Sequence, residues 1–186
     1  MSRELRPRAV RRLNWGCGMH PEPGWINSDV KQGPGIDLSC DIRDGLPLAD
    51  ESIDYVVSIH ALPEVPYPDL VPTLAELRRV LRPEGVLRLA LPNLENAMDA
   101  YRSGDRDYFL IPDTDMRSLG GKLITQLMWY GYSRTMFVPE FSEELLHKAG
   151  FSVVRHVSIG QTHTEHRDIV SLDNRPEESF FVEAIR

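Results

Sequence analysis

The sequence has few of the features that mark secreted or membrane-embedded proteins. Its two cysteines, Cys17 and Cys40, are too few for a disulfide framework, so both thiols are expected to be free. No apolar run approaches the ~18 residues that a membrane-spanning helix requires. No charged segment followed by an apolar one precedes the first expected strand, as it would in a secretory signal peptide. These absences predict a cytoplasmic protein without a membrane span.

The sequence also lacks the positive charge that nonspecific nucleic-acid binding requires. The net charge is −7, which argues against a nucleic-acid partner. Residues 1–12 differ from the rest, with five arginines and one glutamate. Such a run is more often a solvated arm than a binding patch, so a solvated arm is the interpretation here and a binding patch is the alternative. No internal repeat or linker is visible. A chain of 186 residues with 41% hydrophobic residues predicts one domain with a sizeable core.

Residues 12–18, Arg-Leu-Asn-Trp-Gly-Cys-Gly, lead from a strand pattern into a glycine turn. Glycine accepts positive φ and lets the backbone approach a ligand closely. Open α/β sheets build nucleotide pockets where a strand ends in such a turn. The pattern Gly-x-Gly taken alone also fits an ordinary tight turn. A dinucleotide fingerprint would need glycine at position 21, where Pro21 stands, which argues against a nicotinamide-dependent oxidoreductase.

Helical spacing is clear over residues 69–82, where leucines recur on one face before Pro83 and Gly85. Ser142 is expected to be the N-cap of another helix, which ends near Gly150. Two more helices are expected over residues 94–103 and 114–130. Strands are expected to begin near residue 9 and to lie over residues 25–30, 36–41, 54–60, 82–92, 151–160 and 179–186.

The connections between the first three strands are unusually short. Residues 19–24, which include Pro21 and Pro23, separate the glycine turn from the second strand, and residues 31–35 separate the second from the third. Parallel neighbours normally need a crossover of a dozen or more residues. The sequence therefore predicts a sheet trimmed at the edge of strands two and three, with extended loops in place of two helices. A short third strand with non-standard pairing is the alternative.

The order of these segments resembles the class I S-adenosylmethionine-dependent methyltransferases, of the small type 11 kind. The similarity is carried by Leu-Asn-Trp-Gly-Cys-Gly (13–18), Asn-Ser-Asp (27–29), Leu-Pro-Leu-Ala-Asp-Glu-Ser-Ile-Asp (46–54) and Arg-Val-Leu-Arg-Pro-Glu-Gly (79–85). It covers residues 12–92 well, and the ending at 180–184 resembles the last strand of such proteins. It implies an α/β, Rossmann-like methyltransferase sheet, mostly parallel with an antiparallel last strand beside the fifth. We expect one domain over 1–186, with residues 93–140 as a cap.

The resemblance implies S-adenosylmethionine as cofactor. In this interpretation the Gly16 and Gly18 backbone approaches the cofactor, and any side chain at Gly18 would intrude. Asp29 accepts hydrogen bonds from the ribose hydroxyls. A surface-turn role is the alternative for Asp29, a turn cap for Asp41, and bracing of the loop for Asn14. The expected cofactor-binding residues are Asn14, Gly16, Cys17, Gly18, Asp29, Asp41, Ile42 and His60, with Asp41 and Ile42 at the adenine. A packed strand-end histidine is the alternative for His60.

Candidate acceptor-binding residues come from two segments. Pro63-Glu64 stands where many relatives carry Glu-His, so no general base is assigned, and Glu64 is either a base or an exposed carboxylate. The long segment 161–178 emerges at the ligand edge if the sixth strand is parallel to the others, which makes His163, His166 and Arg167 candidates. Metal binding by the two histidines lacks a clear third ligand, so no metal is expected.

Aromatic residues at Trp129, Tyr130 and Tyr132 are interpreted as core or, alternatively, as an apolar wall of the site. The resemblance implies methyl transfer, and the acceptor is expected to be a small molecule, sugar or lipid because the negative net charge disfavours nucleic acid. A cofactor-binding accessory protein without turnover is the alternative.

Overall fold

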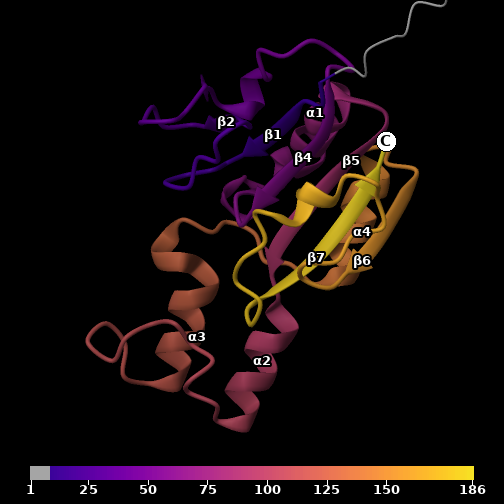
Figure 1. Cartoon of the computed structure of the whole chain (residues 1–186). Coiled ribbons are helices and arrows are strands. Elements are labelled where there is room, and N and C mark those ends of the chain that lie inside the picture. The colour runs from indigo at the N-terminus through magenta and orange to yellow at the C-terminus, as the bar shows by residue number, and fades with distance from the viewer. Residues whose placement is uncertain (1–8) are drawn as a thin grey trace, which may run out of the picture.

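The computed structural model describes residues 9–186, so most of the arginine-rich arm lies outside the described residues. One seven-stranded sheet runs through them in the order β3-β2-β1-β4-β5-β7-β6 (Figure 1). The strands are β1 (Arg12–Trp15), β2 (Ile26–Asp29), β3 (Leu38–Ser39), β4 (Ile53–Ile59), β5 (Leu81–Pro92), β6 (Val153–Val157) and β7 (Ser179–Ile185).

The last strand enters the sheet in the predicted way. β7 pairs antiparallel with β5 on one side and with β6 on the other, while β1 to β5 pair in parallel. β6 therefore points in the same direction as β5. Because β7 points the opposite way, its first residue lies at the same edge of the sheet as the carboxyl ends of the parallel strands.

The short connections at one edge contain no helix, as the sequence predicts. Only residues 16–25 link β1 to β2 and residues 30–37 link β2 to β3, yet both pairs are parallel. Side-chain amides hold this edge together. The Asn27 Oδ1 accepts hydrogen bonds from the Glu22 N–H at 2.8 Å and from the Asn14 Nδ2 at 3.1 Å. These bonds satisfy polar groups in loops that no helix covers.

Residues 9–186 form four α-helices, which are α1 (Leu70–Val80), α2 (Leu94–Ser103), α3 (Leu119–Met128) and α4 (Pro139–Lys148). α1 and α2 match the expected ranges, and α3 is shorter than expected. Ser142 is not an N-cap: Val138 takes that place, and the Ser142 hydroxyl donates to the Pro139 carbonyl inside α4 at 2.7 Å. Proline suits the first helical position because its missing N–H would have no partner there.

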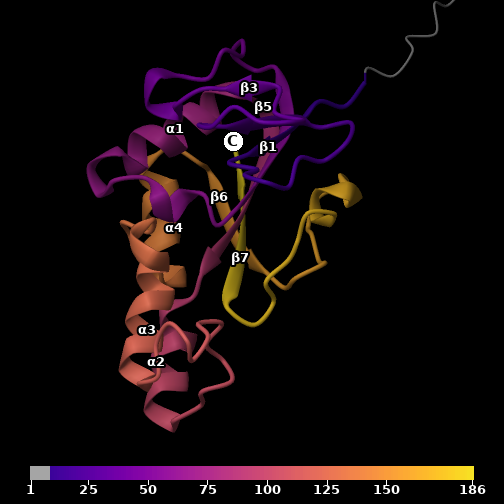
Figure 2. The ribbon, with the colours of Figure 1, turned by 90° about the vertical axis from the view of Figure 1, so that its left-hand side faces the viewer.

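The two faces of the sheet are covered differently (Figure 2). α1 and α4 pack together on one face, with Val56 of β4 in the main core beneath them. The other face is covered by the loop between β6 and β7, where Ile169 of a short 3₁₀ helix (η5, Arg167–Val170) packs against Tyr55 and Val57. A loop, and not a layer of α-helices, therefore covers that face of the sheet.

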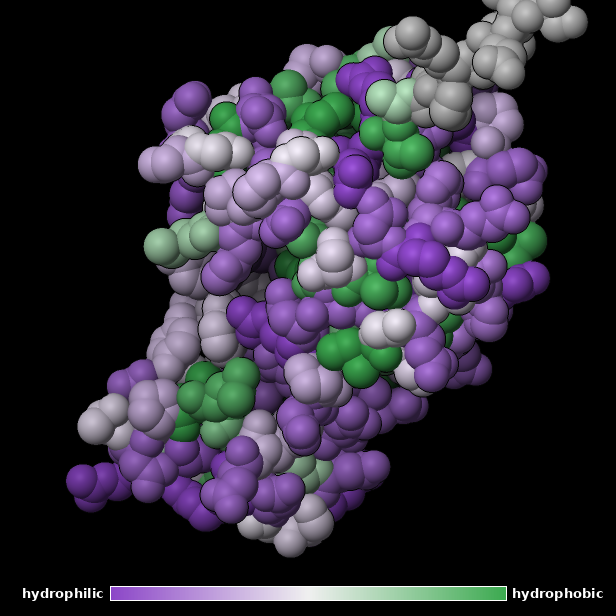
Figure 3. Space-filling view, viewed as in Figure 1, coloured by the Kyte–Doolittle hydropathy of each residue, from purple (hydrophilic) through white to green (hydrophobic). Residues whose placement is uncertain are grey.

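α2 and α3 extend beyond the end of the sheet as a helical lobe (Figure 1). They pack on each other around a small cluster of Ala97, Ala100, Phe109 and Leu123. Hydrophobic side chains gather over α3 in Figure 3, where Ile124 and Met128 are exposed. Within residues 9–186, no helix is long and apolar enough to cross a membrane.

Candidate active site

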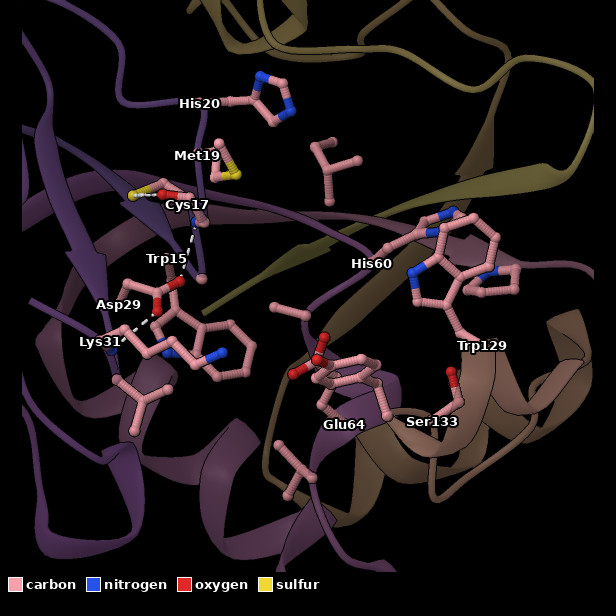
Figure 4. Close-up of a pocket in the computed structure, with 18 of the residues that line it drawn as sticks. Trp15, Cys17, Met19, His20, Asp29, Lys31, His60, Glu64, Trp129 and Ser133 are labelled. Carbon is pink, nitrogen blue, oxygen red and sulfur yellow. Dashed lines mark hydrogen bonds between the residues drawn. The ribbon is translucent and has the colours of Figure 1, made fainter. Parts of the chain in front are cut away.

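A cavity of about 900 Å³ lies at the carboxyl ends of β1, β2 and β4. The glycine turn and the loop after β2 line one side of it, and the short helix η2 (Leu62–Glu64) lines another. The remaining walls come from residues in the 93–134 segment and from the end of the loop before β7. Figure 4 shows that Asp29 and Lys31 face Glu64, Ser133 and Trp129 across this space.

The glycine turn is built from two residues with positive φ, +68° at Gly16 and +54° at Gly18. The Gly16 N–H donates to the Ser28 carbonyl at 2.8 Å, which ties the turn to β2. A Cβ at Gly16 would lie 2.1 Å from the Ala61 Cβ, whereas a Cβ at Gly18 meets no described atom within 4 Å. Packing within the protein therefore requires glycine at position 16. The prediction from the sequence placed the steric restriction at Gly18 instead.

Asp29 ends β2 and holds the turn in place. Its Oδ2 accepts from the Gly18 N–H at 2.8 Å, and its Oδ1 accepts from the Lys31 N–H at 2.9 Å (Figure 4). A carboxylate offers about four acceptor positions, so each oxygen keeps one for a ligand. Asp29 lines the cavity and also has the turn role that the sequence left as its alternative.

Asn14 does not line the cavity. It is 4% exposed, and its Nδ2 donates to the His20 carbonyl and to Asn27, so it braces the loop. Cys17 does line the cavity with a buried side chain. Burial, with a smaller effect of the Asp29 charge, raises the pKa of its thiol to about 11, so the thiol is uncharged at neutral pH.

Asp41 caps the short helix η1 (Ile42–Asp44) by accepting from the Arg43 N–H at 3.0 Å. Its carboxylate also pairs with the Arg43 guanidinium at 2.6 Å, and these hydrogen bonds lower its pKa. Asp41 and Ile42 both line the cavity. The Asp41 carboxylate is nevertheless hydrogen-bonded to Arg43. Asp41 therefore has the capping role that the sequence analysis gave as its alternative.

His60 lies directly after β4 in a left-handed conformation, with φ of +57°. Its Nε2 is 2.7 Å from the Ser179 Oγ at the start of β7. Burial and then the charge of Arg175 lower its pKa from 6.5 to about 3, so the ring is neutral at pH 7. Positive φ in a residue other than glycine is strained and is typical of functional sites.

Glu64 lies across the cavity from Asp29 and is exposed to it (Figure 4). Partial burial, followed by the Asp29 charge, raises the pKa of its carboxyl group, although Lys31 and Arg134 act in the opposite direction. A carboxyl group with a raised pKa accepts protons more readily near neutral pH than an ordinary surface carboxylate does.

His163, His166 and Arg167 do not line this cavity, although β6 has the direction that the prediction required. The loop folds instead over the face of the sheet that α1 and α4 do not cover, because Ile169 is buried there. The His166 ring lies 5.0 Å from the Tyr55 ring, and the His163 N–H donates to Glu183. The structure therefore places these three residues outside the cavity at the carboxyl ends of the strands.

The end of the same loop reaches the cavity instead. Arg175 and Glu178 line it and form an ion pair of 2.8 Å. The Arg175 guanidinium carbon lies 5.5 Å from the centre of the Trp129 ring. The sequence reasoning missed these residues, although one signal was available: an antiparallel last strand must begin at the ligand edge.

The aromatic turn of the lobe forms another wall of the cavity. Trp129, Tyr130 and Gly131 all have positive φ, which ends α3 and turns Trp129 and Tyr132 toward the cavity. Tyr130 points elsewhere, with its hydroxyl donating to Asp115 at 2.6 Å. Tyr130 and Tyr132 are exposed, so the core interpretation is wrong for them.

Comparison with known proteins shows which proteins the chain is similar to. Residues 14–89 match a family model described as a methyltransferase domain. A methyltransferase from Thermotoga maritima, described as S-adenosylmethionine-dependent and a possible histamine N-methyltransferase, is 18% identical with a TM-score of 0.61, over 97% of this chain and 84% of its own. No curated protein matches the sequence.

Two other solved structures are similar over most of the chain. An S-adenosylmethionine-dependent methyltransferase from Archaeoglobus fulgidus is 16% identical, with a TM-score of 0.59 over 95% of this chain and 86% of its own. One from Mesorhizobium loti is 17% identical, with a TM-score of 0.57 over 95% and 91%.

The matched residues include the glycine turn, Asp29 and most of β5, and the fold similarity extends over the remaining strands. The chain therefore matches a methyltransferase domain over residues 14–89 and has the fold of the S-adenosylmethionine-dependent methyltransferases to which it is similar.

Proposed function

We propose that the protein transfers a methyl group from S-adenosylmethionine to a small-molecule, sugar or lipid acceptor held in the cavity. One observation carries the proposal: the cavity of about 900 Å³ extends from the glycine turn to the aromatic turn of the helical lobe. Small-molecule pockets occupy ~300–1,000 Å³. The cavity therefore has room for a cofactor on the sheet side and for part of an acceptor against the lobe.

The residues on the sheet side fit the cofactor. Gly16 leaves no space for a side chain against Ala61, and the open space beside Gly18 lets a ligand approach the backbone. Asp29 keeps free acceptor positions for a diol. Because Asp41 is bound to Arg43, we assign adenine contact to the backbone and side chain of Ile42 and not to the Asp41 carboxylate.

When bound, S-adenosylmethionine supplies a methyl group on a positively charged sulfur, which is already a good leaving group. The main task of the chain is then to align the acceptor and to exclude water. Trp129 and Tyr132 provide an apolar wall for this purpose. Glu64 takes a proton from the acceptor if the nucleophile arrives protonated, since its raised pKa suits that role better than the neutral, weakly basic His60.

The cofactor half of the proposal is tested by thermal melting. S-adenosylmethionine and S-adenosylhomocysteine are expected to raise the melting temperature, whereas NAD and ATP are not. Ligand at 100 times its dissociation constant adds ~2.7 kcal/mol to the free energy of unfolding. Mass spectrometry of the purified protein is expected to detect retained S-adenosylhomocysteine. An unchanged melting temperature with S-adenosylmethionine and with S-adenosylhomocysteine, each at millimolar concentration, would contradict the proposal.

A further inference from the structure

We propose that the acceptor carries a carboxylate or phosphate group and that Arg134 binds this group. The inference rests on the proposed function and specifies its substrate class. It begins from the charges that line the cavity, and it places the anionic end of the acceptor beside Ser133 and Glu64, on the side of the cavity away from the glycine turn.

Among the described residues, four Lys or Arg side chains line the cavity, and three of them already have partners. Arg43 pairs with Asp41 at 2.6 Å, and Arg175 pairs with Glu178 at 2.8 Å. The Lys31 ammonium group lies 5.8 Å from the centre of the Tyr132 ring. That contact engages its charge with an aromatic face.

Arg134 differs from these three. Within residues 9–186 its guanidinium group makes no hydrogen bond and no ion pair. Its charge acts on Glu64 only through space. An exposed guanidinium that faces a cavity retains its planar set of donors for an incoming ligand. This donor set matches the two oxygens of a carboxylate or phosphate.

The backbone fixes the place of Arg134. Its N–H donates to the Pro63 carbonyl at 2.8 Å, and the Thr135 N–H donates to the same oxygen at 3.2 Å. The Thr135 hydroxyl also donates to the Val65 carbonyl at 3.4 Å. These bonds join the lobe to η2, so Arg134 and Glu64 are carried by two segments that are bonded to each other. Binding of an anionic group by Arg134 would hold the rest of the acceptor near Glu64.

Two neighbours suit such a ligand. Ser133 and Trp129 line the cavity together with Glu64, on the side that faces Asp29 and Lys31 (Figure 4). A hydroxyl group adds one donor for an anion oxygen, and an indole ring provides an apolar surface for the body of the acceptor. Asp29 and the glycine turn, which we assign to the cofactor, lie on the opposite side of the cavity.

The test uses simple aromatic probes, since the acceptor is unidentified. Benzoate, phenyl phosphate and neutral benzamide are titrated into the protein, with and without saturating S-adenosylhomocysteine, and binding is measured by ligand-observed NMR. We expect at least one anionic probe to bind the S-adenosylhomocysteine-saturated protein more tightly than benzamide. Arg134→Gln is expected to weaken that probe about tenfold or more, the usual consequence of losing hydrogen bonds to a charged group.

Two further variants, compared with Arg134→Gln, separate specific binding by Arg134 from a general effect of charge. Arg117→Gln removes the same charge from an exposed residue of the lobe that does not line the cavity, and it is expected to leave probe binding unchanged. Arg134→Lys is expected to retain part of the affinity, because it keeps the charge and loses the planar donor set. The affinity for S-adenosylhomocysteine is expected to change less than twofold in all three.

Each other outcome has a definite meaning. Benzoate alone indicates a carboxylate acceptor, and phenyl phosphate alone indicates a phosphate acceptor. Equal binding of benzamide, or equal loss in Arg117→Gln, would overturn the inference. A loss of S-adenosylhomocysteine affinity in Arg134→Gln would also overturn it, because Arg134 would then serve the cofactor. Failure of the wild-type protein to bind S-adenosylhomocysteine contradicts the proposed function itself.

Discussion

The Nε2 atom of His60 and the Oγ atom of Ser179 lie 2.7 Å apart, which joins the end of β4 to the start of β7 at the edge of the cavity. This contact exists because the antiparallel last strand begins where the parallel strands end. It fixes a neutral imidazole in a strained backbone conformation beside the proposed methyl-transfer position. Stability should therefore depend on the protonation of His60.

The pH dependence of unfolding tests this relationship. The pKa of His60 is lowered from 6.5 to about 3 in the folded protein, so the unfolded chain binds the proton more readily. The stabilisation is fully present above pH 6.5 and is lost as the pH falls toward 3. His60→Asn, which tolerates positive φ, should remove this component. Urea unfolding of both proteins from pH 4.5 to 7.5 is the measurement, and parallel curves would argue against a buried neutral histidine.

Gly16 and Gly18 should respond differently to alanine. Gly16→Ala combines positive φ with a Cβ 2.1 Å from that of Ala61, so β4 and the turn must move apart. Gly18→Ala meets only the left-handed backbone cost of ~1–2 kcal/mol. We expect Gly16→Ala to lower the free energy of unfolding by a further ~1–3 kcal/mol. Chemical denaturation measures both, and the reverse order would contradict the described turn.

Asp29→Ala should reduce both cofactor affinity and stability. Losing the hydrogen bonds to a ribose diol corresponds to ~1.5–3 kcal/mol of binding free energy. The Gly18 and Lys31 N–H groups also lose their acceptor, which should lower the unfolding free energy modestly. Calorimetry with S-adenosylhomocysteine and a melting curve separate the two effects. Unchanged affinity with lower stability would restrict Asp29 to holding the turn.

The loop between β6 and β7 should depend on one buried arginine. Arg88 is fully buried in β5 and pairs with Asp173 of the loop at 2.5 Å and with Glu183 of β7 at 2.8 Å. Arg88→Met leaves two buried carboxylates without their positively charged partner, which should cost ~3–5 kcal/mol. Arg106→Met breaks an exposed pair with Asp113 and should cost ~0–1 kcal/mol. Similar losses in the two variants, measured by urea unfolding, would contradict this view.

Much of the fold could be predicted because its signals are local. Leucines at helical spacing predicted α1, and connections too short for a helix predicted the trimmed edge. The path of residues 161–178 could not be predicted in this way. It is decided by the burial of Ile169 on the far face and by the pairing of Asp173 with Arg88. Both contacts join residues far apart in the sequence.

The site shows the same division. Gly16, Gly18 and Asp29 were predicted because a turn and a strand end are properties of short segments. Arg134 could not be placed in the site from the sequence, because its position depends on a hydrogen bond to Pro63, which is far away in the chain. The occupation of Asp41 by Arg43 depends on side-chain direction, which the pattern of residue types does not specify.

Transfer of a labelled methyl group tests the central claim most directly. The protein is incubated with S-adenosylmethionine bearing a deuterated methyl group and with fractionated cell extract, and products are identified by mass spectrometry. We predict a labelled product in the small-molecule or lipid fraction, formed more slowly by Asp29→Ala at S-adenosylmethionine concentrations that do not saturate the variant. Retention of S-adenosylhomocysteine by the purified protein, together with no labelled product in any fraction, would contradict the account.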